Sequence, residues 1–327
     1  MSTVPSTPSA LFPVRVARKT VETLDICTFE LVDVHGGALP PFSAGAHVDV
    51  EVKSGLVRQY SLCNDPAETH RYLIGVLRDP ASRGGSVAMH TLVEEGMLIN
   101  ISAPKNHFAL AREARRSLLL AGGIGVTPIL CMAERLSATG AGFDMHYCTR
   151  SKNGTAFLGR IQDSDFADRV HFHFDDGPAE RKADLAALLA APDAGTHLYV
   201  CGPGGFLDAV VTTAKKQGWA EGNIHFEYFS AKLDPNAAAG SFDVKIASSG
   251  RIVPVAADQT VLAALASAGV ELPFSCEQGV CGTCLTRVIE GEPDHRDAFL
   301  TDVEKARNDQ FLPCCSRARS PMLVLDL

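Results

Sequence analysis

The C-terminal part of the chain concentrates residue types that bind metals. Cys276, Cys281 and Cys284 form a C-x4-C-x2-C pattern, and Cys314 follows after 29 intervening residues. This is the ligand spacing of a plant-type [2Fe-2S] centre, in which four thiolates bind two irons. Glycines in the same loop permit the tight backbone that lets N–H groups point at the sulfurs. The adjacent Cys315 should point its side chain elsewhere, as a small buried or partly exposed thiol.

A structural zinc site is the alternative interpretation of these thiols. Such sites often combine two paired-ligand knuckles, whereas this sequence contains one C-x2-C pair. Residues 1–13 lack the basic start and the apolar stretch of a secretory signal, which disfavours a disulfide framework. The spacing therefore favours an iron–sulfur centre. His171 and His173 would share one face of an expected strand, but without a third ligand we favour a surface or core role for them.

A glycine-rich turn in the middle of the chain offers a phosphate site. Residues 118–121 are an apolar run typical of a buried strand, residues 122–125 read Gly-Gly-Ile-Gly, and Thr127 before a proline is a typical helix N-cap. A helix N-terminus presents N–H donors to a phosphate, and glycines let a ligand approach the backbone. The pattern departs from G-x-G-x-x-G, so a tight connection explains it equally well. Cys201-Gly202 begins a second such turn, where Cys201 would otherwise be a buried core thiol.

Two short motifs nearer the N-terminus place polar groups on a strand and in a loop. Arg58-Gln59-Tyr60-Ser61 offers a cation, an aromatic face and a hydroxyl, and alternation puts Arg58 and Tyr60 on one face with Ser61 on the other. Gly84-Gly85-Ser86, before an expected helix, offers an anion site. Taken alone, these residues are most simply a plain strand and an ordinary loop.

The elements that must position these residues change in character along the chain. Short strands separated by turn residues fill the first hundred residues and predict an all-β barrel with one helix. From residue 117, strands alternate with helices, which predicts a parallel sheet with ligands at the carboxyl ends of its strands. Residues 234–240 lack apolar periodicity and predict a linker. The expected strands are 14–18, 27–32, 47–52, 59–64, 72–77, 97–103, 118–121, 143–149, 198–201, 242–246 and 251–255, and the expected helices are 87–94, 128–138, 184–190, 205–217 and 261–268.

Composition narrows the class of function. The 327 residues carry 30 Lys and Arg against 38 Asp and Glu, a formal charge of −8, which disfavours a nucleic-acid-binding protein. The longest uncharged stretch, residues 117–133, contains three glycines and a proline and changes its apolar period midway, so we expect no membrane span. The expected location is the cytoplasm.

Taken in order, the motifs resemble those of one family. Their order resembles that of the phthalate dioxygenase reductase family, which includes vanillate demethylase and phenoxybenzoate dioxygenase reductases. That order is the Arg58-x-Tyr60-Ser61 motif, the two glycine loops, the Cys201-Gly202 turn and then the C-terminal cysteines. The resemblance covers nearly the whole chain. It implies a multidomain β, α/β and α+β protein: an antiparallel FMN-binding β-barrel (1–112), a Rossmann-like NAD-binding domain with a parallel sheet (113–230), a linker (231–241) and a β-grasp ferredoxin domain (242–327).

The resemblance also implies which residues bind the cofactors, and it implies FMN rather than FAD. Glu227-Tyr228-Phe229 matches the family's stretch before the linker, where an aromatic lies by the flavin, and we choose Phe229 for that position. No residue is expected to be an acid–base catalyst. By the same resemblance Arg58 and Ser86, with Gly85 beside it, would hold the FMN phosphate. Tyr60 would pack on the isoalloxazine, and Ser61 would lie near the flavin N5. For the dinucleotide, the resemblance implies an approach to Gly123, Gly125 and Thr127, with Cys201 and Gly202 by the nicotinamide.

Arg150 and Ser151 bear on the choice of nucleotide. In this family the residue after the Thr-Arg pair of the second middle-domain strand is often acidic, which suits a free ribose 2′-hydroxyl, but here Ser151 follows Thr149-Arg150. Arg150 and Ser151 would also accommodate a 2′-phosphate. The rest of the resemblance favours NADH over NADPH.

The resemblance implies the reductase component of an aromatic-ring oxygenase or demethylase. Nicotinamide gives two electrons and an iron–sulfur cluster takes one at a time, so a flavin must bridge them. The expected partner is a terminal oxygenase with a Rieske centre, toward which the net negative charge would help to steer the encounter, and a monomer is the simplest assembly. The alternatives are an NADPH-dependent reductase of a haem monooxygenase and a non-catalytic redox-sensing or zinc-binding adaptor.

Overall fold

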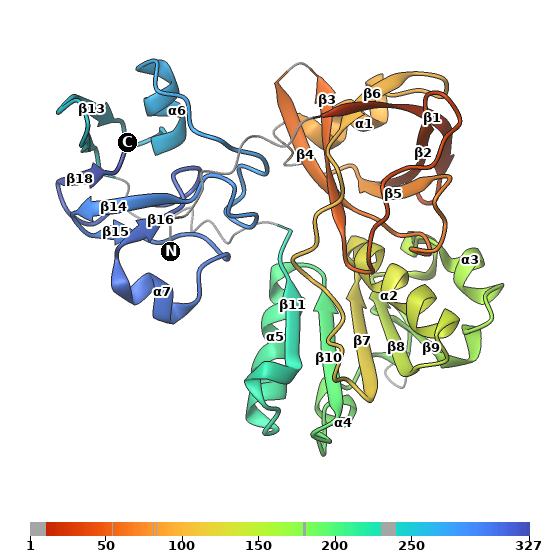
Figure 1. The fold of residues 1–327 in the computed structure, drawn as a ribbon. Helices are drawn as coiled ribbons and strands as arrows, with labels where there is room; N and C mark the ends of the chain where they lie inside the picture. Colours follow the sequence, from red (N-terminus) through yellow and green to blue (C-terminus); the bar gives the residue numbers. More distant parts are fainter. Residues whose placement is uncertain (1–10, 54, 81, 83, 179–180, 230–239) are drawn as a thin grey trace. The chain divides into compact units, whose positions relative to one another are not determined.

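The computed structural model describes residues 11–53, 55–80, 82, 84–178, 181–229 and 240–327. Within these residues the chain forms two units, the first ending at Glu227 and the second running from Tyr228 to Leu327 (Figure 1). The expected linker 231–241 falls outside the described residues except for its last two positions. Each unit is therefore described by itself.

An antiparallel sheet opens the first unit. Alternation builds its core: in the first strand Val14 and Val16 are fully buried, whereas Arg15 between them is exposed. Leu62 forms a bridge with Ile74, so the two end strands of the sheet meet, as the predicted barrel requires. The strands are β1 Phe12–Val21, β2 Ile26–Asp33, β3 His47–Lys53, β4 Leu56–Ser61, β5 Tyr72–Leu77 and β6 Leu98–Ile101, in the order β4-β3-β6-β1-β2-β5, and the helix is α1 Gly85–Leu92.

A five-stranded parallel sheet completes the first unit. All of its strands run in one direction, so their carboxyl ends form one edge, as expected for a ligand-binding α/β sheet. The strands are β7 Arg116–Gly122, β8 Gly142–Thr149, β9 Val170–Phe174, β10 Thr196–Cys201 and β11 Ile224–Glu227, in the order β11-β10-β7-β8-β9, with helices α2 Val126–Ala138, α3 Leu158–Gln162, α4 Leu185–Leu188 and α5 Gly204–Lys216.

The two sheets of the first unit share one hydrophobic core. Ile26 and Leu73 of the antiparallel sheet are buried in the same cluster as Leu119 and Tyr147 of the parallel sheet and the apolar face of α2. Gly75 of β5 lies against α2 so closely that a Cβ there would come within 2.8 Å of Thr127 Cγ2. This shared packing places the two predicted cofactor regions in fixed positions relative to each other.

The second unit is a mixed sheet with a helix and a cysteine loop. The strand pair β12–β18 is parallel and its neighbours are antiparallel, which is the arrangement of the expected β-grasp fold. Its elements are β12 Phe242–Ile246, β13 Ile252–Val255, α6 Val261–Ser267, β14 Thr286–Glu290, α7 Asp302–Arg307, β16 Gln310–Phe311 and β18 Met322–Leu325 in the sheet order β13-β12-β18-β14-β16, with a separate pair β15 Pro293–Asp294 and β17 Arg317–Ala318.

Several boundaries differ from the sequence-based expectation. The fourth strand covers residues 56–61 rather than 59–64, because the Asn64 side chain accepts a hydrogen bond from Leu73 N–H and ends the strand in a turn. Helix α2 begins at Val126, so Thr127 is not its N-cap: the 3₁₀ turn Gly123–Gly125 runs directly into the helix. The helix expected at 184–190 covers only 185–188.

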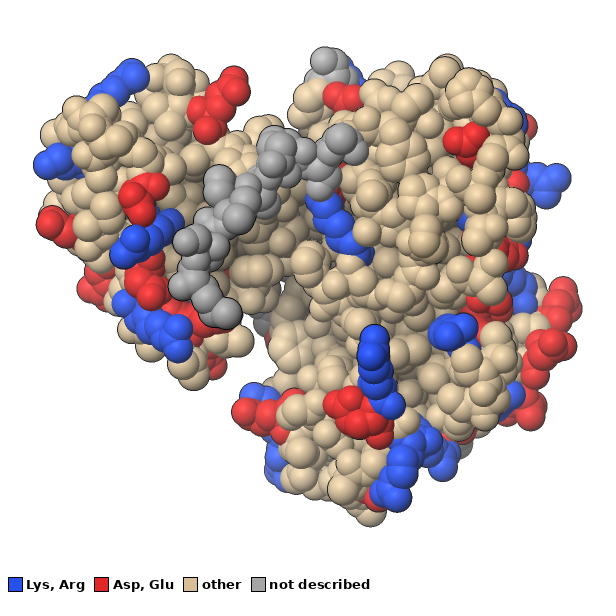
Figure 2. All heavy atoms as spheres, in the orientation of Figure 1, with Lys and Arg blue, Asp and Glu red and all other residues tan. Residues whose placement is uncertain are grey.

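The distribution of charged side chains and the length of the helices concern the two classes that the sequence disfavours, nucleic-acid-binding and membrane-spanning proteins. On the face drawn in Figure 2, Lys and Arg side chains are interspersed with Asp and Glu. Among the residues described, every helix is too short or too polar to cross a membrane.

Gly125 offers a test of the packing between the two glycine turns. A Cβ at this position would lie 2.3 Å from the carbonyl oxygen of Cys201, which is backbone and unable to move aside. We expect Gly125→Ala to lower the free energy of unfolding by about 1–3 kcal/mol. Urea unfolding followed by fluorescence of Trp219, the single tryptophan, measures this within the first unit. As a control, Gly205→Ala meets no atom within 4 Å and should be neutral or slightly stabilising; equal losses in both variants would contradict the prediction.

Candidate functional site

The second unit brings the four predicted ligand cysteines together. The loop between α6 and β14 carries Cys276, Cys281 and Cys284, and the turn after β16 carries Cys314. Strands β14 and β16 are antiparallel, with Thr286 opposite Phe311, so the cysteines just outside this ladder lie on the same side of it. All four residues are between 3% and 8% exposed.

The thiols meet as two pairs. The Cys276 thiol donates a hydrogen bond to Cys281, which raises the pKa of Cys276 and lowers that of Cys281. The Cys284 thiol donates in the same way to Cys314, raising its own pKa and lowering that of Cys314. Two pairs of thiolates are the ligand arrangement that two irons need.

Backbone N–H groups of the cysteine loop point at the sulfurs, as we predicted from the glycines in this loop. Gln278 N–H donates to Cys276 Sγ at 3.3 Å. Further N–H groups, from Gly279 to Cys314 and from Thr283 to Cys281, lower the pKa of each acceptor thiol. N–H donors favour the thiolate forms, so the loop suits an iron–sulfur cluster.

A fifth thiol lies beside the four predicted ligands. The fifth thiol, Cys315, is buried as expected but does not point wholly elsewhere, since it donates a hydrogen bond to Cys314. The Cys284 thiol thus meets Cys314, the residue that the spacing predicts as the fourth ligand.

In the first unit, β4 and the start of α1 form a setting for a phosphate. Arg58 lies against the first turn of α1, where a Cβ on Gly85 would come within 2.5 Å of Arg58 Cγ. Gly84 precedes the helix with φ +92°, which favours glycine, and Ser86 Oγ accepts a hydrogen bond from Asp79 N–H. A guanidinium beside helix N–H groups fits a phosphate.

Tyr60 and Ser61 lie on opposite faces of β4, as alternation predicted. Tyr60 is paired with Val48 and Ser61 with His47, in a register without a bulge at these positions. The Tyr60 hydroxyl is buried and has no hydrogen-bond partner among the residues that the structure describes, and burial raises its pKa. An orphaned buried hydroxyl near Arg58 is consistent with a polar ligand that the protein alone does not supply.

The glycine turns after β7 and β10 pack against each other. Gly125 lies against the Cys201 carbonyl, and a Cβ on Gly202 would come within 2.9 Å of Gly122 Cα. Gly123 differs: its φ is +52° and nothing lies within 4 Å of its Cβ position. Gly125 and Gly202 therefore serve the contact between strand ends, and Gly123 leaves open space for a ligand.

Thr127 lies in the packing between α2 and β5. Its side chain is 1% exposed, and its hydroxyl donates to the Ile124 carbonyl at 3.0 Å. The side chain therefore shapes the turn rather than facing open solvent.

The carboxyl ends of β10 and β11 place a thiol beside a carboxyl group. Cys201 is fully buried and pairs in register with Glu227. One Glu227 oxygen is buried and, within the described part of the chain, has no hydrogen-bond partner; burial raises the pKa of this carboxyl to about 8. Sequence reasoning noted Glu227 within a motif but gave it no role, since only tertiary structure shows a carboxyl buried at a ligand-binding edge.

Arg150 and Ser151 follow β8, and two aspartates lie beside them. Ser151 Oγ caps the next 3₁₀ turn by accepting from Gly154 N–H, while Arg150 is exposed. Asp176 N–H donates to the Arg150 carbonyl and Asp175 N–H to that of Thr149. The aspartates were missed because they lie some 25 positions away along the chain.

Two further expectations concern Phe229 and the histidines. Phe229 is exposed and belongs to the second unit, so its distance from the flavin-site residues is not defined.

The predicted histidine pair lacked a third member, His146. Its Nδ1 lies 3.0 Å from His173 Nε2, and its ring stacks on His171. Burial lowers the pKa of His146 to about 4, which keeps the His146 ring uncharged at neutral pH.

Comparison with protein-family models identifies two segments. Residues 244–319 match the 2Fe-2S iron-sulfur cluster binding domain, and the buried cysteine pairs lie within this range. Residues 99–224 match the N-terminal domain of dimethylamine monooxygenase subunit DmmA-like proteins.

Whole-length relatives extend the similarity to the entire chain. A vanillate O-demethylase oxidoreductase from a Pseudomonas species (strain HR199) is 58% identical over 303 residues, covering 93% of this chain and 96% of the relative. A solved phthalate dioxygenase reductase is 39% identical with a TM-score of 0.80, covering 97% of this chain and 98% of that one. An intact type IV self-sufficient cytochrome P450 monooxygenase has the same identity and TM-score, but the match covers 41% of its chain.

These similarities span both units and include the cysteine loop. The chain therefore belongs to the phthalate dioxygenase reductase family, the electron-transferring iron–sulfur flavoprotein oxidoreductases that serve as reductase components of oxygenase systems.

Proposed function

We propose that this protein carries electrons from NADH to a Rieske-type terminal oxygenase of an aromatic oxygenase or demethylase system. The observation that carries the proposal is that one chain contains two buried cysteine pairs, a candidate phosphate site at Arg58 and the start of α1, and an α/β sheet. The relative that is 58% identical over nearly its full length supports a vanillate O-demethylase system as the setting.

The proposal assigns one cofactor to each part of the chain. Residues 1–112 are the FMN domain, residues 113–230 the nucleotide domain, and residues 242–327 the cluster domain, joined by the linker 231–241. Bound FMN supplies the exchange between a two-electron hydride donor and a one-electron cluster. The fold supplies proximity and orientation.

The FMN domain holds its cofactor through two groups of contacts. Arg58 and the first N–H groups of α1, with Gly85 and Ser86, bind the phosphate. Tyr60 covers the flavin ring system, and its hydroxyl forms a hydrogen bond with the cofactor. Ser61 faces the reacting edge of the flavin. Phe229 remains the residue that the family resemblance proposes as the aromatic by the flavin.

The nucleotide domain binds NADH at the carboxyl edge of its sheet. Gly123 admits the dinucleotide to the backbone, while Gly125 and Thr127 shape the turn that receives it. Cys201, Gly202 and the buried Glu227 lie at the nicotinamide end, where a protonated carboxyl donates a hydrogen bond to the carboxamide.

Charge favours NADH over NADPH in this proposal. Arg150 and Ser151 would accept a 2′-phosphate, but Asp175 and Asp176 lie beside them and repel one. The free ribose hydroxyl of NADH carries no such charge, so it suits this edge of the sheet better.

The similarity to a P450 monooxygenase keeps one alternative open to experiment. There the matched region is part of a longer chain, so a related module serves a haem enzyme. We favour a separate Rieske oxygenase because the vanillate relative matches end to end at higher identity. We further propose that the protein acts as a cytoplasmic monomer.

Purified protein tests the proposal directly. We expect bound FMN, two irons and acid-labile sulfide per chain, faster turnover with NADH than with NADPH, and electron delivery to a Rieske oxygenase in preference to a haem acceptor. Zinc without flavin would contradict the proposal and support an adaptor. A strong NADPH preference would contradict the assignment of Arg150, Ser151, Asp175 and Asp176.

Cys281→Ser tests the ligand assignment. We expect loss of cluster reduction while NADH still bleaches the flavin, because the substitution removes one of four thiolates and leaves the first unit unchanged. Stopped-flow absorbance and electron paramagnetic resonance (EPR) measure the two steps. Cys315→Ser is the matched control, since it removes the neighbouring thiol that is not a ligand. Normal electron delivery to a one-electron protein acceptor by Cys281→Ser would contradict the assignment.

Arg58→Gln tests the phosphate setting. The side chain retains hydrogen-bonding groups but loses its charge, so we expect roughly ten- to hundredfold weaker FMN binding, as for loss of one charged hydrogen bond. Fluorescence titration of deflavinated protein with FMN measures the Kd. Arg15→Gln removes an equal charge from the exposed face of β1 and should leave the Kd unchanged. If both variants bind FMN equally well, the phosphate lies elsewhere.

Glu227→Gln tests the buried carboxyl through pH. The folded pKa of about 8 exceeds the ordinary value of 4.5, so the folded state holds a proton that the unfolded state releases between these pH values. This contribution to stability is complete below about pH 4.5 and is lost as pH rises to about 8. The Gln variant should lose this pH dependence, whose slope is at most about 1.4 kcal/mol per pH unit.

Urea unfolding from pH 5 to 8, followed by Trp219 fluorescence, measures the difference between wild type and variant. Glu221→Gln, whose side chain is 83% exposed, is the control and should track the wild type. Parallel curves for wild type and Glu227→Gln would show that this carboxyl does not titrate as described.

A further inference from the structure

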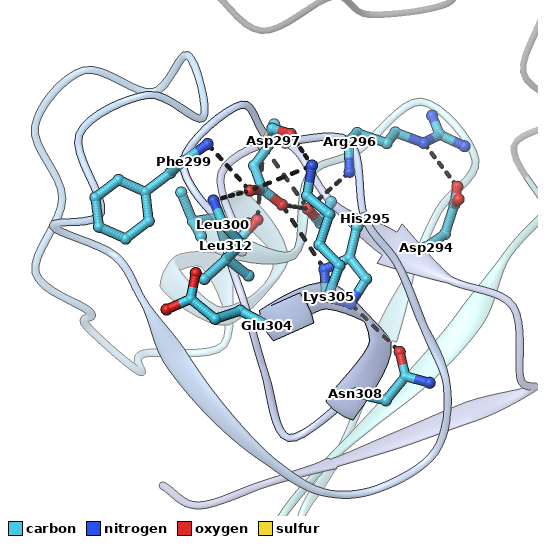
Figure 3. Close-up of polar contacts among 12 residues, drawn as sticks. Asp294, His295, Arg296, Asp297, Phe299, Leu300, Glu304, Lys305, Asn308 and Leu312 are labelled. Atoms are coloured by element: carbon cyan, nitrogen blue, oxygen red, sulfur yellow. Dashed lines mark hydrogen bonds and ion pairs between the residues drawn. The ribbon is translucent and has the colours of Figure 1, made fainter. Parts of the chain in front are cut away.

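A buried carboxylate lies beside the cysteine loop and is not one of its ligands. Asp297 belongs to the segment between β15 and α7, and its side chain is completely buried. Figure 3 shows this carboxyl at the centre of a group of polar contacts drawn from the segment before α7 and from α7 itself. The proposed electron path does not use this residue as a ligand or carrier.

The carboxylate determines the conformation of its own segment. One oxygen, Oδ2, accepts hydrogen bonds from Leu300 N–H at 2.8 Å and Phe299 N–H at 3.2 Å. The other, Oδ1, accepts from the Ser316 hydroxyl at 3.4 Å. Asp297 therefore joins residues 297–300 to the chain two positions beyond Cys314.

Two basic side chains lie near the limit of ion-pair distance from this carboxyl group. The nearest basic groups are His295 Nδ1, 3.7 Å from Oδ1, and Lys305 Nζ, 4.0 Å from Oδ2. His295 Nδ1 makes no hydrogen bond, and Lys305 Nζ instead donates to the Asp297 carbonyl at 2.7 Å (Figure 3). The hydrogen bonds to Oδ2 therefore come from backbone N–H groups rather than from these side chains.

The segment that Asp297 shapes contacts the cysteine loop on both sides of Cys281. Ala298 N–H donates to the Gly279 carbonyl at 3.0 Å. The Phe299 ring packs on Gly282, which has φ +71° and no room for a Cβ. The neighbouring Leu300 is buried in one cluster with two ligand cysteines, Cys284 and Cys314.

We propose that Asp297 is a positioning residue for the [2Fe-2S] cluster, which holds residues 297–300 against the cysteine loop and places a buried negative charge near the cluster. The inference rests on the proposed ligation by the four cysteines. A nearby negative charge opposes the arrival of an electron, so Asp297 lowers the reduction potential. The same segment covers the loop and slows loss of iron.

Two variants of the full-length holoprotein separate charge from positioning. Asp297→Asn keeps an oxygen for the Phe299 and Leu300 N–H groups but removes the charge. We expect normal iron content and a reduction equilibrium at least tenfold more favourable, a rise of about 59 mV. Asp297→Ala removes both, so we also expect severalfold faster iron release to a chelator. Asp302→Asn, on the exposed start of α7, is the control and should change neither quantity.

The measurements are an EPR-monitored redox titration and chelator kinetics, neither of which depends on turnover. A midpoint potential in Asp297→Asn no higher than in the control overturns the charge effect and with it the proposal. Iron release from Asp297→Ala at the wild-type rate overturns the positioning role, and if that variant does not fold, the Asn variant decides. Wild-type protein without an EPR signal after dithionite treatment would instead disprove the cluster ligation on which the inference rests.

Discussion

The pairing of Cys284 with Cys314 is the contact on which the cluster site depends. These thiols are separated by 29 residues, and the antiparallel ladder between β14 and β16 brings their segments together. The first three cysteines are held by their local spacing, so only the fourth depends on the sheet. A register shift in this short ladder would turn the segment that carries Cys314 away from the other ligands, because alternate residues of a strand face opposite sides.

The two glycine turns of the first unit show a second way in which backbone contacts build a site. Gly125 and Gly202 are needed because β7 and β10 end against each other, with no space for a side chain between the turns. Gly123 alone combines a positive φ with open space. The two turns thus contain glycines with different purposes: Gly125 and Gly202 bring the strand ends together, and Gly123 leaves open space.

A buried carboxyl oxygen occurs in each unit, and the two groups differ in their hydrogen-bond partners. Glu227 lies at the carboxyl end of a strand with one oxygen unpartnered, and burial raises its pKa to about 8. Asp297 instead accepts hydrogen bonds from two N–H groups and a hydroxyl. A carboxyl without donors favours its neutral form, so Glu227 suits hydrogen-bond donation, whereas the oxygens of Asp297 accept hydrogen bonds that hold chain segments together.

Sequence alone determined the features that depend on local spacing: the grouping of three proposed cysteine ligands in one loop, the glycine turns, the alternation of Arg58, Tyr60 and Ser61, and most strands and helices of the first unit. The resemblance of ordered motifs identified the family. Tertiary structure decided the pairing of Cys284 with Cys314, the burial of Thr127, the packing of Gly125, the third histidine, and the positions of Glu227 and Asp297. These properties depend on contacts between segments far apart in the chain, and residue spacing carries no information about which buried groups meet there.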